Sequence, residues 1–196
     1  MRELVLASSS PYRAALLEKL GLPFITSAPY INEARIGAES APQLAERLAL
    51  EKAFALAQDH PDALIIGSDQ VAELDGTQLT KPGSFDRAVD QLQRCSGRGV
   101  IFHTGLCLLD PRSGTHQKAV EPFEVAFREL EPDEIENYLR REEPYDCAGS
   151  FKCEGLGITL FRGLNGRDFN SLIGLPLIRL CEMLRVKGVN PLLPEA

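Results

Sequence analysis

The stretch from Ala63 to Val71, with the sequence A-L-I-I-G-S-D-Q-V, most constrains the fold that this chain can adopt. Its apolar run L-I-I is typical of a short buried strand. The run ends at a glycine followed by Ser68, Asp69 and Gln70, so a hydroxyl, a carboxylate and an amide lie where the strand stops. In open α/β sheets, ligands bind at the ends of strands. A lone aspartate after a strand is more often a turn or helix-capping residue, so the rest of the chain must decide whether Asp69 belongs to a site.

Length and charge narrow the class of protein. The chain has 196 residues, which suffices for a sizeable core in one large domain or in two lobes that share a sheet. We find no internal repeat or linker, so a single α/β domain over residues 1–196 is the simplest organisation. The formal net charge of −7 argues against a protein that binds the backbone of a nucleic acid polymer. An anionic substrate would need a few local lysines and arginines.

The N-terminus and the cysteines indicate a cytoplasmic protein. Only four apolar residues follow Met1-Arg2-Glu3, which is too short for a signal peptide or a membrane span. The five cysteines include no C-x-x-C pair, and the three histidines are scattered. This pattern predicts free thiols in a reducing compartment, with neither a disulfide framework nor a zinc site.

The start of the chain predicts a strand, a serine-rich turn and a helix. Residues 4–7 form the strand, Ser10 is the expected N-cap, and the helix runs over 12–20 at helical spacing before Gly21. Ser8, Ser10 and the backbone N–H groups of such a helix start can bind an anion, and Arg13 adds a positive charge. The alternative is that the serines serve only as cap and turn.

The middle of the chain adds further charged residues at the ends of predicted elements. The pattern predicts a strand at 24–27, a loop at 28–40 with Glu33, a helix at 41–59, a hairpin at 74–77 and a helix at 85–95. Lys52 falls late on its helix, where complementing the helix dipole is a sufficient explanation. Lys81 lies in a T-K-P turn and is forced toward extended backbone by the proline.

The second half predicts two long strands and a polar loop. The strands cover 100–109 and 118–128 and are followed by a helix from about 131 to 142. The loop Glu143–Gly155, E-P-Y-D-C-A-G-S-F-K-C-E-G, is dense in charged and small residues, including Lys152 and Glu154, which favours a site loop over a solvated connection. A strand at 157–161, a turn at 163–166 and a last helix at 177–186 complete the mixed α/β prediction.

The charged residues in these segments indicate phosphoryl chemistry. A P-loop, a dinucleotide-binding G-x-G-x-x-G and a G-x-S-x-G elbow are all absent from the sequence. What remains is a set of carboxylates and a set of cations at strand ends, helix ends and loops. Cations neutralise phosphate oxygens, carboxylates hold Mg²⁺ or Mn²⁺, and one carboxylate can accept a proton from water.

Several motifs together resemble the Maf family of nucleoside triphosphate pyrophosphatases. They are L-A-S-S-S-P-Y-R, Glu33, E-K-A at 51–53, G-S-D-Q, T-K-P, the loop 143–155 and F-N-S-L-I-G-L-P at 169–176. The resemblance covers nearly the whole chain. It implies an elongated mixed sheet with flanking helices, similar to the inosine triphosphate pyrophosphatases, with two lobes around a cleft. It also implies hydrolysis of a nucleoside triphosphate to the monophosphate and pyrophosphate with a divalent metal cation.

The resemblance assigns roles residue by residue. Asp69 matches the family's proposed proton acceptor, and Glu33 and Asp69 are the candidate metal ligands. The positions that match phosphate-binding residues are Ser8, Ser10, Arg13, Lys52, Lys81 and Lys152.

Three further positions select the base in this family. They fall on Tyr12, Gln70 and Glu154, whereas the branch that hydrolyses dTTP and UTP has Arg, Thr and Gln there, so the resemblance implies the 7-methyl-GTP branch. The chemistry agrees, because a purine methylated at N7 is positively charged and gains about 0.5–2 kcal/mol from a cation–π contact with an aromatic ring. A carboxylate such as Glu154 can accept hydrogen bonds from guanine N1–H and the exocyclic amine.

Two other functions stay open at this point. The Maf family has been linked to inhibition of septum formation, so a nucleotide-binding regulator of cell division is one alternative, and a pyrophosphatase acting on dTTP or UTP is another. The leading interpretation is an enzyme that removes 7-methyl-GTP from the nucleotide pool. Its partner is a small nucleotide, with neither a nucleic acid polymer nor a membrane, and a homodimer is left open.

Overall fold

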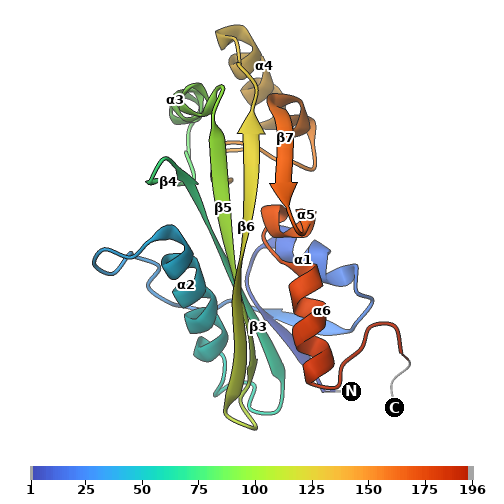
Figure 1. The fold of residues 1–196 in the computed structure, drawn as a ribbon. Helices are drawn as coiled ribbons and strands as arrows, with labels where there is room; N and C mark the ends of the chain where they lie inside the picture. The colour runs from blue at the N-terminus through green and yellow to red at the C-terminus, as the bar shows by residue number, and fades with distance from the viewer. Residues whose placement is uncertain (1, 194–196) are drawn as a thin grey trace. The chain divides into compact units, whose positions relative to one another are not determined.

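The computed structural model describes residues 2–193, so both ends of the predicted domain, residue 1 and residues 194–196, lie outside the described residues. The helices and strands follow one another in a mixed α/β order (Figure 1). They are β1 Leu4–Ala7, α1 Pro11–Glu18, β2 Phe24–Ser27, α2 Ala41–Ala55, β3 Leu64–Leu74, β4 Thr77–Leu79, α3 Phe85–Cys95, β5 Gly99–Asp110, β6 Thr115–Phe127, α4 Pro132–Glu142, the 3₁₀ helix η1 Leu156–Leu160, β7 Phe161–Gly166, α5 Phe169–Ile173 and α6 Leu177–Val186.

The strands form one mixed seven-stranded sheet in the order β2-β1-β3-β5-β6-β7, with β4 paired to β3. Strand β1 pairs in parallel with both β2 and β3, whereas β3 with β4 and β6 with β7 are antiparallel. The predicted mixed sheet with flanking helices is therefore confirmed. No helix among residues 2–193 is long and apolar enough to cross a bilayer.

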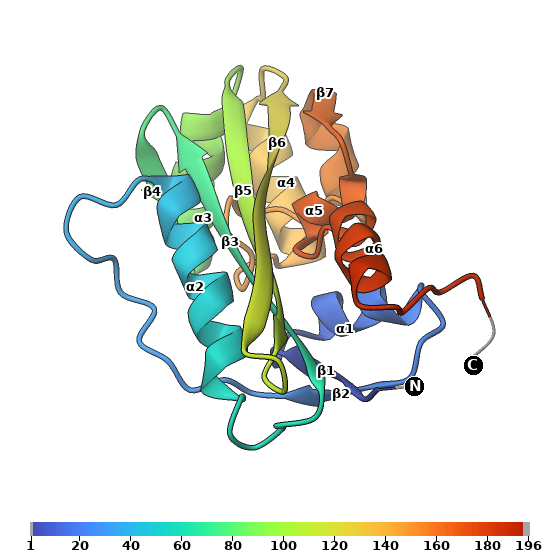
Figure 2. The same ribbon diagram turned by 60° about the horizontal axis from the view of Figure 1, so that its bottom comes forward.

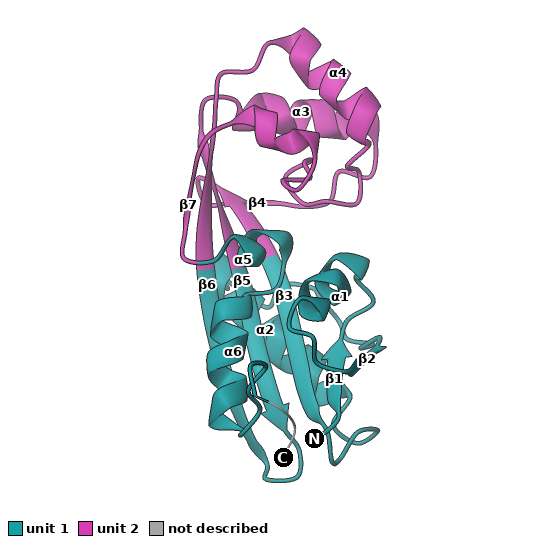
Figure 3. Cartoon of the chain, turned by 90° about the vertical axis from the view of Figure 1, so that its right-hand side faces the viewer, with its two compact units in different colours: residues 1–70, 104–121, 168–196 teal, residues 71–103, 122–167 magenta. Residues whose placement is uncertain are grey.

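The chain divides into two compact units, which Figure 3 colours separately. Unit 1 comprises residues 1–70, 104–121 and 168–196, and unit 2 comprises residues 71–103 and 122–167. The predicted cleft remains a prediction.

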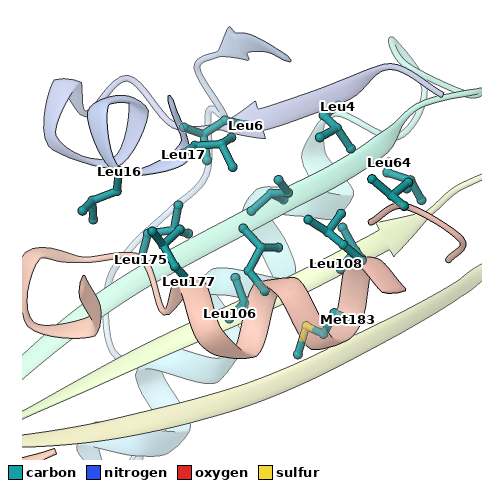
Figure 4. Close-up of a cluster of buried hydrophobic side chains, with 14 residues drawn as sticks. Leu4, Leu6, Leu16, Leu17, Leu64, Leu106, Leu108, Leu175, Leu177 and Met183 are labelled. Carbon is teal, nitrogen blue, oxygen red and sulfur yellow. The ribbon is translucent and has the colours of Figure 1, made fainter. Parts of the chain in front are cut away.

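In unit 1 the alternation of side chains along three strands separates two apolar cores. On one face, Leu4 and Leu6 of β1 cluster with leucines of β3 and β5 and with α1 and α6, as Figure 4 shows. On the other face, Val5 and Ala7 pack with Ile65 of β3 and with the alanines of α2. Figure 2 shows α2 and α6 on opposite sides of these strands. Unit 1 therefore has helices on both faces of its strands.

Two glycines allow α2 to lie directly against the strands. A Cβ at Gly67 of β3 would overlap the carbonyl oxygen of Ala49, and one at Gly105 of β5 would overlap that of Ala45. Neither glycine has a positive φ, so the requirement is for space and not for an unusual backbone conformation. The close approach fixes where the last turn of α2, with Lys52, lies relative to the middle of β3.

We expect Gly67→Ala to lower the free energy of unfolding by about 1–3 kcal/mol, because α2 would have to move away from β3. Chemical denaturation measures the change. Gly163→Ala is the matched control, since a Cβ there would meet nothing within 4 Å. An unchanged midpoint for Gly67→Ala would contradict the close-packing argument.

A buried carboxylate at the end of β5 makes the stability of unit 1 depend on pH. Asp110 accepts hydrogen bonds from Arg2 at 2.6 Å and from Lys187 at 2.9 Å, and these two cations hold its pKa well below the usual range. Because the folded-state pKa is depressed, the stabilisation is present above the unfolded-state value of about 3.9 and is lost as the pH falls toward the folded-state value.

Asp110→Asn is therefore expected to lower the free energy of unfolding near neutral pH and to flatten its acid dependence. Denaturant titrations at a series of pH values measure both effects. An acid dependence as steep as that of the wild type would show that other carboxylates are responsible.

Unit 2 has an aromatic core. Phe151 makes edge-to-face contacts with Phe102, Phe127 and Phe161, with ring centroids 4.9–5.6 Å apart. Phe151 belongs to the loop 143–155, and its neighbour Ser150 is fully buried and donates to Gln91 at 2.6 Å. The loop is thus an anchored segment and not a solvated connection.

Four local predictions are wrong. The strand predicted to stop at Gly67 continues to Leu74, so Ser68, Asp69 and Gln70 lie within β3 and not beyond its end. The predicted strand at 157–161 is the 3₁₀ helix η1, the predicted turn at 163–166 belongs to strand β7, and the helix predicted to reach residue 59 ends at Ala55. At Gly157 a Cβ would overlap the carbonyl oxygen of Lys152, so the chain coils tightly there against the preceding loop. Strand β7 is mostly exposed and pairs with β6 through its backbone, and it therefore lacks the apolar alternation that identifies a half-buried strand.

Candidate active site

The alternation along β3 places Asp69 on the same face as Gly67, facing α2. There the Nζ of Lys52 lies 2.6 Å from Oδ1 of Asp69 and 2.7 Å from Oε1 of Glu33. Lys52 and Asp69 are only 7% and 8% exposed, whereas the side chain of Glu33 is 59% exposed. Lys52 therefore does more than complement the helix dipole, because one ammonium group joins a buried and an exposed carboxylate.

The start of α1 forms a second part of the site in unit 1. Ser10 is the N-cap and accepts a hydrogen bond from the backbone N–H of Arg13. Ser8 is buried and its Oγ accepts from Ser10 N at 3.1 Å and from Arg13 Nη1 at 3.4 Å. Because both contacts use the oxygen as acceptor, the hydroxyl proton of Ser8 can be donated to an anion. Ser10 thus caps α1, and Ser8, in the turn before it, also lies beside the cation of Arg13.

Arg13 is held in place by the segment after α5. Its Nε donates to the carbonyl oxygen of Gly174 at 2.9 Å. Desolvation lowers the pKa of Arg13 from its ordinary value, while the negative charges of Asp69 and Glu33 act in the opposite direction. A guanidinium group stays protonated despite such a shift. An oriented, desolvated positive charge interacting with both carboxylates is well suited to bind phosphate.

The opposite face of β3 presents Ser68 and Gln70. Ser68 is fully buried and its hydroxyl lies within hydrogen-bond distance of the carbonyl oxygens of Gly105 and Gly174. The Nε2 of Gln70 donates to the carbonyl oxygens of Ser171 and Leu172, each at 2.9 Å. Since carbonyls can only accept, the amide cannot flip, and the oxygen of Gln70 is the atom left to accept from a ligand.

Three predicted residues belong to unit 2. Lys81 is exposed in the turn after β4, and the neighbouring N–H of Gly83 donates to the carbonyl of Tyr145 at 3.0 Å. Lys152 is half-buried, and its Nζ donates to the carbonyl of Glu142 at 3.2 Å. Glu154 is exposed. The Gly83–Tyr145 bond joins the turn of Lys81 to the loop 143–155 that contains Lys152.

Two carboxylates of unit 1, Glu33 and Asp69, are suited to bind a divalent cation whose other ligands would come from the substrate's phosphate groups and from water. Glu33 and Asp69 both contact one ammonium group, which shows that their oxygens can converge on a single positive charge. Mg²⁺ in phosphoryl-transfer sites is commonly held by one or two carboxylates, with phosphate oxygens and water completing the shell. Among residues 2–193, three or more His, Cys, Asp or Glu side chains nowhere converge as a metal site.

Two residues that contact the candidate site residues, Thr104 and Gly174, were not singled out from the sequence. Thr104 is fully buried, lies 3.0 Å from Gln70 Nε2 and donates to the carbonyl of Ser171 at 2.8 Å. Gly174, with φ of 128°, accepts from both Ser68 and Arg13. Their contacts are long-range in sequence, so only the motif at 169–176 pointed to this segment.

The chain is an α/β protein whose candidate site combines a buried lysine–aspartate pair, a capped helix start and a desolvated arginine, a set of charges suited to a phosphate-bearing ligand. A family model described as Maf-like protein matches residues 3–187, and the chain belongs to the Maf family. It is 56% identical over 190 residues to a 7-methyl-GTP pyrophosphatase of Pseudomonas savastanoi pv. phaseolicola (strain 1448A / Race 6), covering 97% of this chain and 99% of that protein.

Two solved structures are similar at lower levels. A nucleoside-triphosphatase described as a dITP/XTP pyrophosphatase from Mycobacterium abscessus is 18% identical, with a TM-score of 0.42, over 65% of this chain and 75% of that chain. A HAM1 protein from Coxiella burnetii is also 18% identical, with a TM-score of 0.43, over 65% and 73%.

Proposed function

We propose that this protein is a nucleoside triphosphate pyrophosphatase that hydrolyses 7-methyl-GTP to 7-methyl-GMP and pyrophosphate. The principal support is the buried Asp69–Lys52 pair, in which Asp69 lies within β3, together with 56% identity over nearly full length to a 7-methyl-GTP pyrophosphatase. Such an enzyme removes a modified nucleotide from the pool before polymerases use it. The proposal implies a cytoplasmic location, a single functional domain and a small-molecule nucleotide as partner.

In the proposed mechanism Asp69 is the general base. Lys52 donates to Oδ1 of Asp69, which orients the carboxylate and leaves its second oxygen to accept a proton from the attacking water. Attack occurs at the α-phosphorus, and the departing pyrophosphate gains negative charge as the bond breaks. Ser8, Ser10 and Arg13 are proposed to bind phosphate oxygens at the start of α1, where the helix dipole adds to the positive charge.

A divalent cation, Mg²⁺ or Mn²⁺, would neutralise phosphate charge and polarise water when bound, with Glu33 and Asp69 as its proposed ligands. Lys81 and Lys152 are proposed phosphate-binding residues on the family resemblance. Lys152 Nζ donates to a backbone carbonyl, which fixes the direction of its ammonium group.

Base selection is proposed for Tyr12, Gln70 and Glu154. Tyr12 would stack on the positively charged methylated purine, and the exposed carboxylate of Glu154 would accept from guanine N–H groups. Gln70 presents its amide oxygen, because its nitrogen is bound to backbone carbonyls. All three therefore favour a cationic base that donates hydrogen bonds.

The test is pyrophosphate release from 7-methyl-GTP, GTP, dTTP, UTP and ITP, measured with Mg²⁺ and with Mn²⁺. The proposal predicts selective release from 7-methyl-GTP and no activity after chelation of the metal. Preference for dTTP and UTP would place the protein in the pyrimidine branch instead. No release from any nucleotide would favour the regulatory alternative in septum formation, and sedimentation of the same sample decides the question of a homodimer.

A further inference from the structure

The segment that contains Glu33 has little apolar burial to hold it. Residues 32–38, between β2 and α2, are all exposed, and Figure 2 shows this segment running as a loop beside α2. An exposed loop without a hydrophobic anchor depends on polar contacts for its position. Glu33 is a proposed metal ligand, so whatever fixes this loop also fixes a functional carboxylate.

Arg47 of α2 makes several of the polar contacts that hold the loop. Its Nη2 donates to the carbonyl oxygen of Ala34 at 2.9 Å. Its Nε and Nη2 also form a bidentate pair with the carboxylate of Glu39, at 2.6 and 3.0 Å. Nη1 is held from the helix side by Glu51, one turn further along α2, at 3.0 Å. Arg47 thus contacts the loop at Ala34, next to Glu33, and at Glu39, just before α2 begins.

The network is partly shielded from water, although the side chain of Glu51 is 38% exposed. The side chains of Arg47 and Glu39 are only 18% and 17% exposed. Their contact raises the pKa of Arg47 and lowers the pKa of Glu39, so both stay charged at any physiological pH. A bidentate guanidinium–carboxylate pair fixes geometry as well as distance, which a lysine ammonium cannot do.

Two cations of the same helix therefore bind consecutive residues of the loop, Lys52 at Glu33 and Arg47 at Ala34. We propose that Arg47 is a positioning residue for the reaction: it holds the 33–39 loop against α2 so that the Glu33 carboxylate reaches the Lys52–Asp69 pair. This inference rests on the proposed function for its catalytic consequence. The position of Glu33 itself can be tested without substrate.

The first experiment is hydrogen–deuterium exchange of the free protein. Arg47→Met keeps the length of the side chain and removes the fork, and Arg47→Lys keeps the charge alone. Arg179→Met is the matched control, because Arg179 of α6 also contacts two carboxylates, Glu121 and Glu182, at 3.0 and 2.8 Å. We expect amides of residues 33–39 to exchange faster in both Arg47 variants and at the wild-type rate in the control. Unchanged exchange of the loop would overturn the proposal.

The second experiment is a double-mutant cycle with Glu33→Gln, followed by pyrophosphate release. In the wild-type background Arg47→Met should lower kcat/KM about tenfold, as loss of a supporting contact to a ligand does. In the Glu33→Gln background it should have no further effect, because the group that it positions is gone. An equal loss in both backgrounds would show that Arg47 acts independently of Glu33 and would overturn the proposal. If wild-type protein hydrolyses no nucleotide, the proposed function fails, while the exchange measurement still decides what holds the loop.

Discussion

Asp69→Asn is expected to lower kcat for 7-methyl-GTP by about 10³-fold, because an amide cannot accept a proton from the attacking water. The substitution is nearly isosteric, and Lys52 retains Glu33 as a charged neighbour, so the fold should survive. Single-turnover measurements report the chemical step directly. A loss confined to KM would indicate that Asp69 binds substrate or metal without serving as the base.

Asp110→Asn is the control for this experiment. Asp110 is also a buried carboxylate paired with cations, Arg2 and Lys187, but it was assigned no role in the site. Its substitution should cost stability and leave kcat unchanged. If Asp69→Asn kept more than about a tenth of the wild-type rate, the assignment of Asp69 as general base would be wrong.

The second large effect concerns the choice of base. Replacing Tyr12, Gln70 and Glu154 together by Arg, Thr and Gln should reverse the preference between 7-methyl-GTP and dTTP, with the ratio of kcat/KM values changing by about 10²-fold or more. The stacking ring and the accepting carboxylate are lost together. Threonine at position 70 is also too short to keep both bonds of Gln70 to Ser171 and Leu172.

The single substitutions separate these contributions. Glu154→Gln should weaken the binding of 7-methyl-GTP and of GTP alike, since both bases present the same N1–H and exocyclic amine. Tyr12→Leu should reduce the preference for 7-methyl-GTP over GTP, because only the methylated base is positively charged. A triple variant that loses all activity without gaining dTTP or UTP hydrolysis would contradict the assignment of these positions to base selection.

Much of the fold was predictable because local signals agreed with the tertiary structure. Ser10 as N-cap and Gly21 beyond the end identified α1. The apolar run at 64–66 correctly marked the start of β3. Such elements depend on capping, turn chemistry and periodicity, which a single sequence displays.

The wrong secondary-structure predictions concern segments whose structure depends on backbone contacts. Strand β7 pairs with β6 at the edge of the sheet and is mostly exposed, so no apolar pattern marks it. The turn of η1 follows from a close approach between Gly157 and Lys152 that spacing alone does not reveal. Short α5 spans only Phe169–Ile173, which is below the length that helical periodicity can identify.

The members of the candidate site were proposed from the sequence, but the contacts between them were not. Lys52 alone is explained by the helix dipole, and only the folded chain brings it to both Glu33 and Asp69. Nothing in the sequence marks Arg47 as a residue that supports the site, since an arginine with a glutamate four residues later is also typical of an ordinary helix surface. Thr104 contacts Gln70, which is distant from it in the sequence. A single sequence does not reveal such contacts.

The most direct test of the central claim is hydrolysis of 7-methyl-GTP in ¹⁸O-labelled water, with both products analysed by mass. The account predicts one labelled oxygen in 7-methyl-GMP and none in pyrophosphate, because water activated by Asp69 attacks the α-phosphorus. Label in inorganic phosphate or in pyrophosphate would place the attack at another phosphorus and contradict the account.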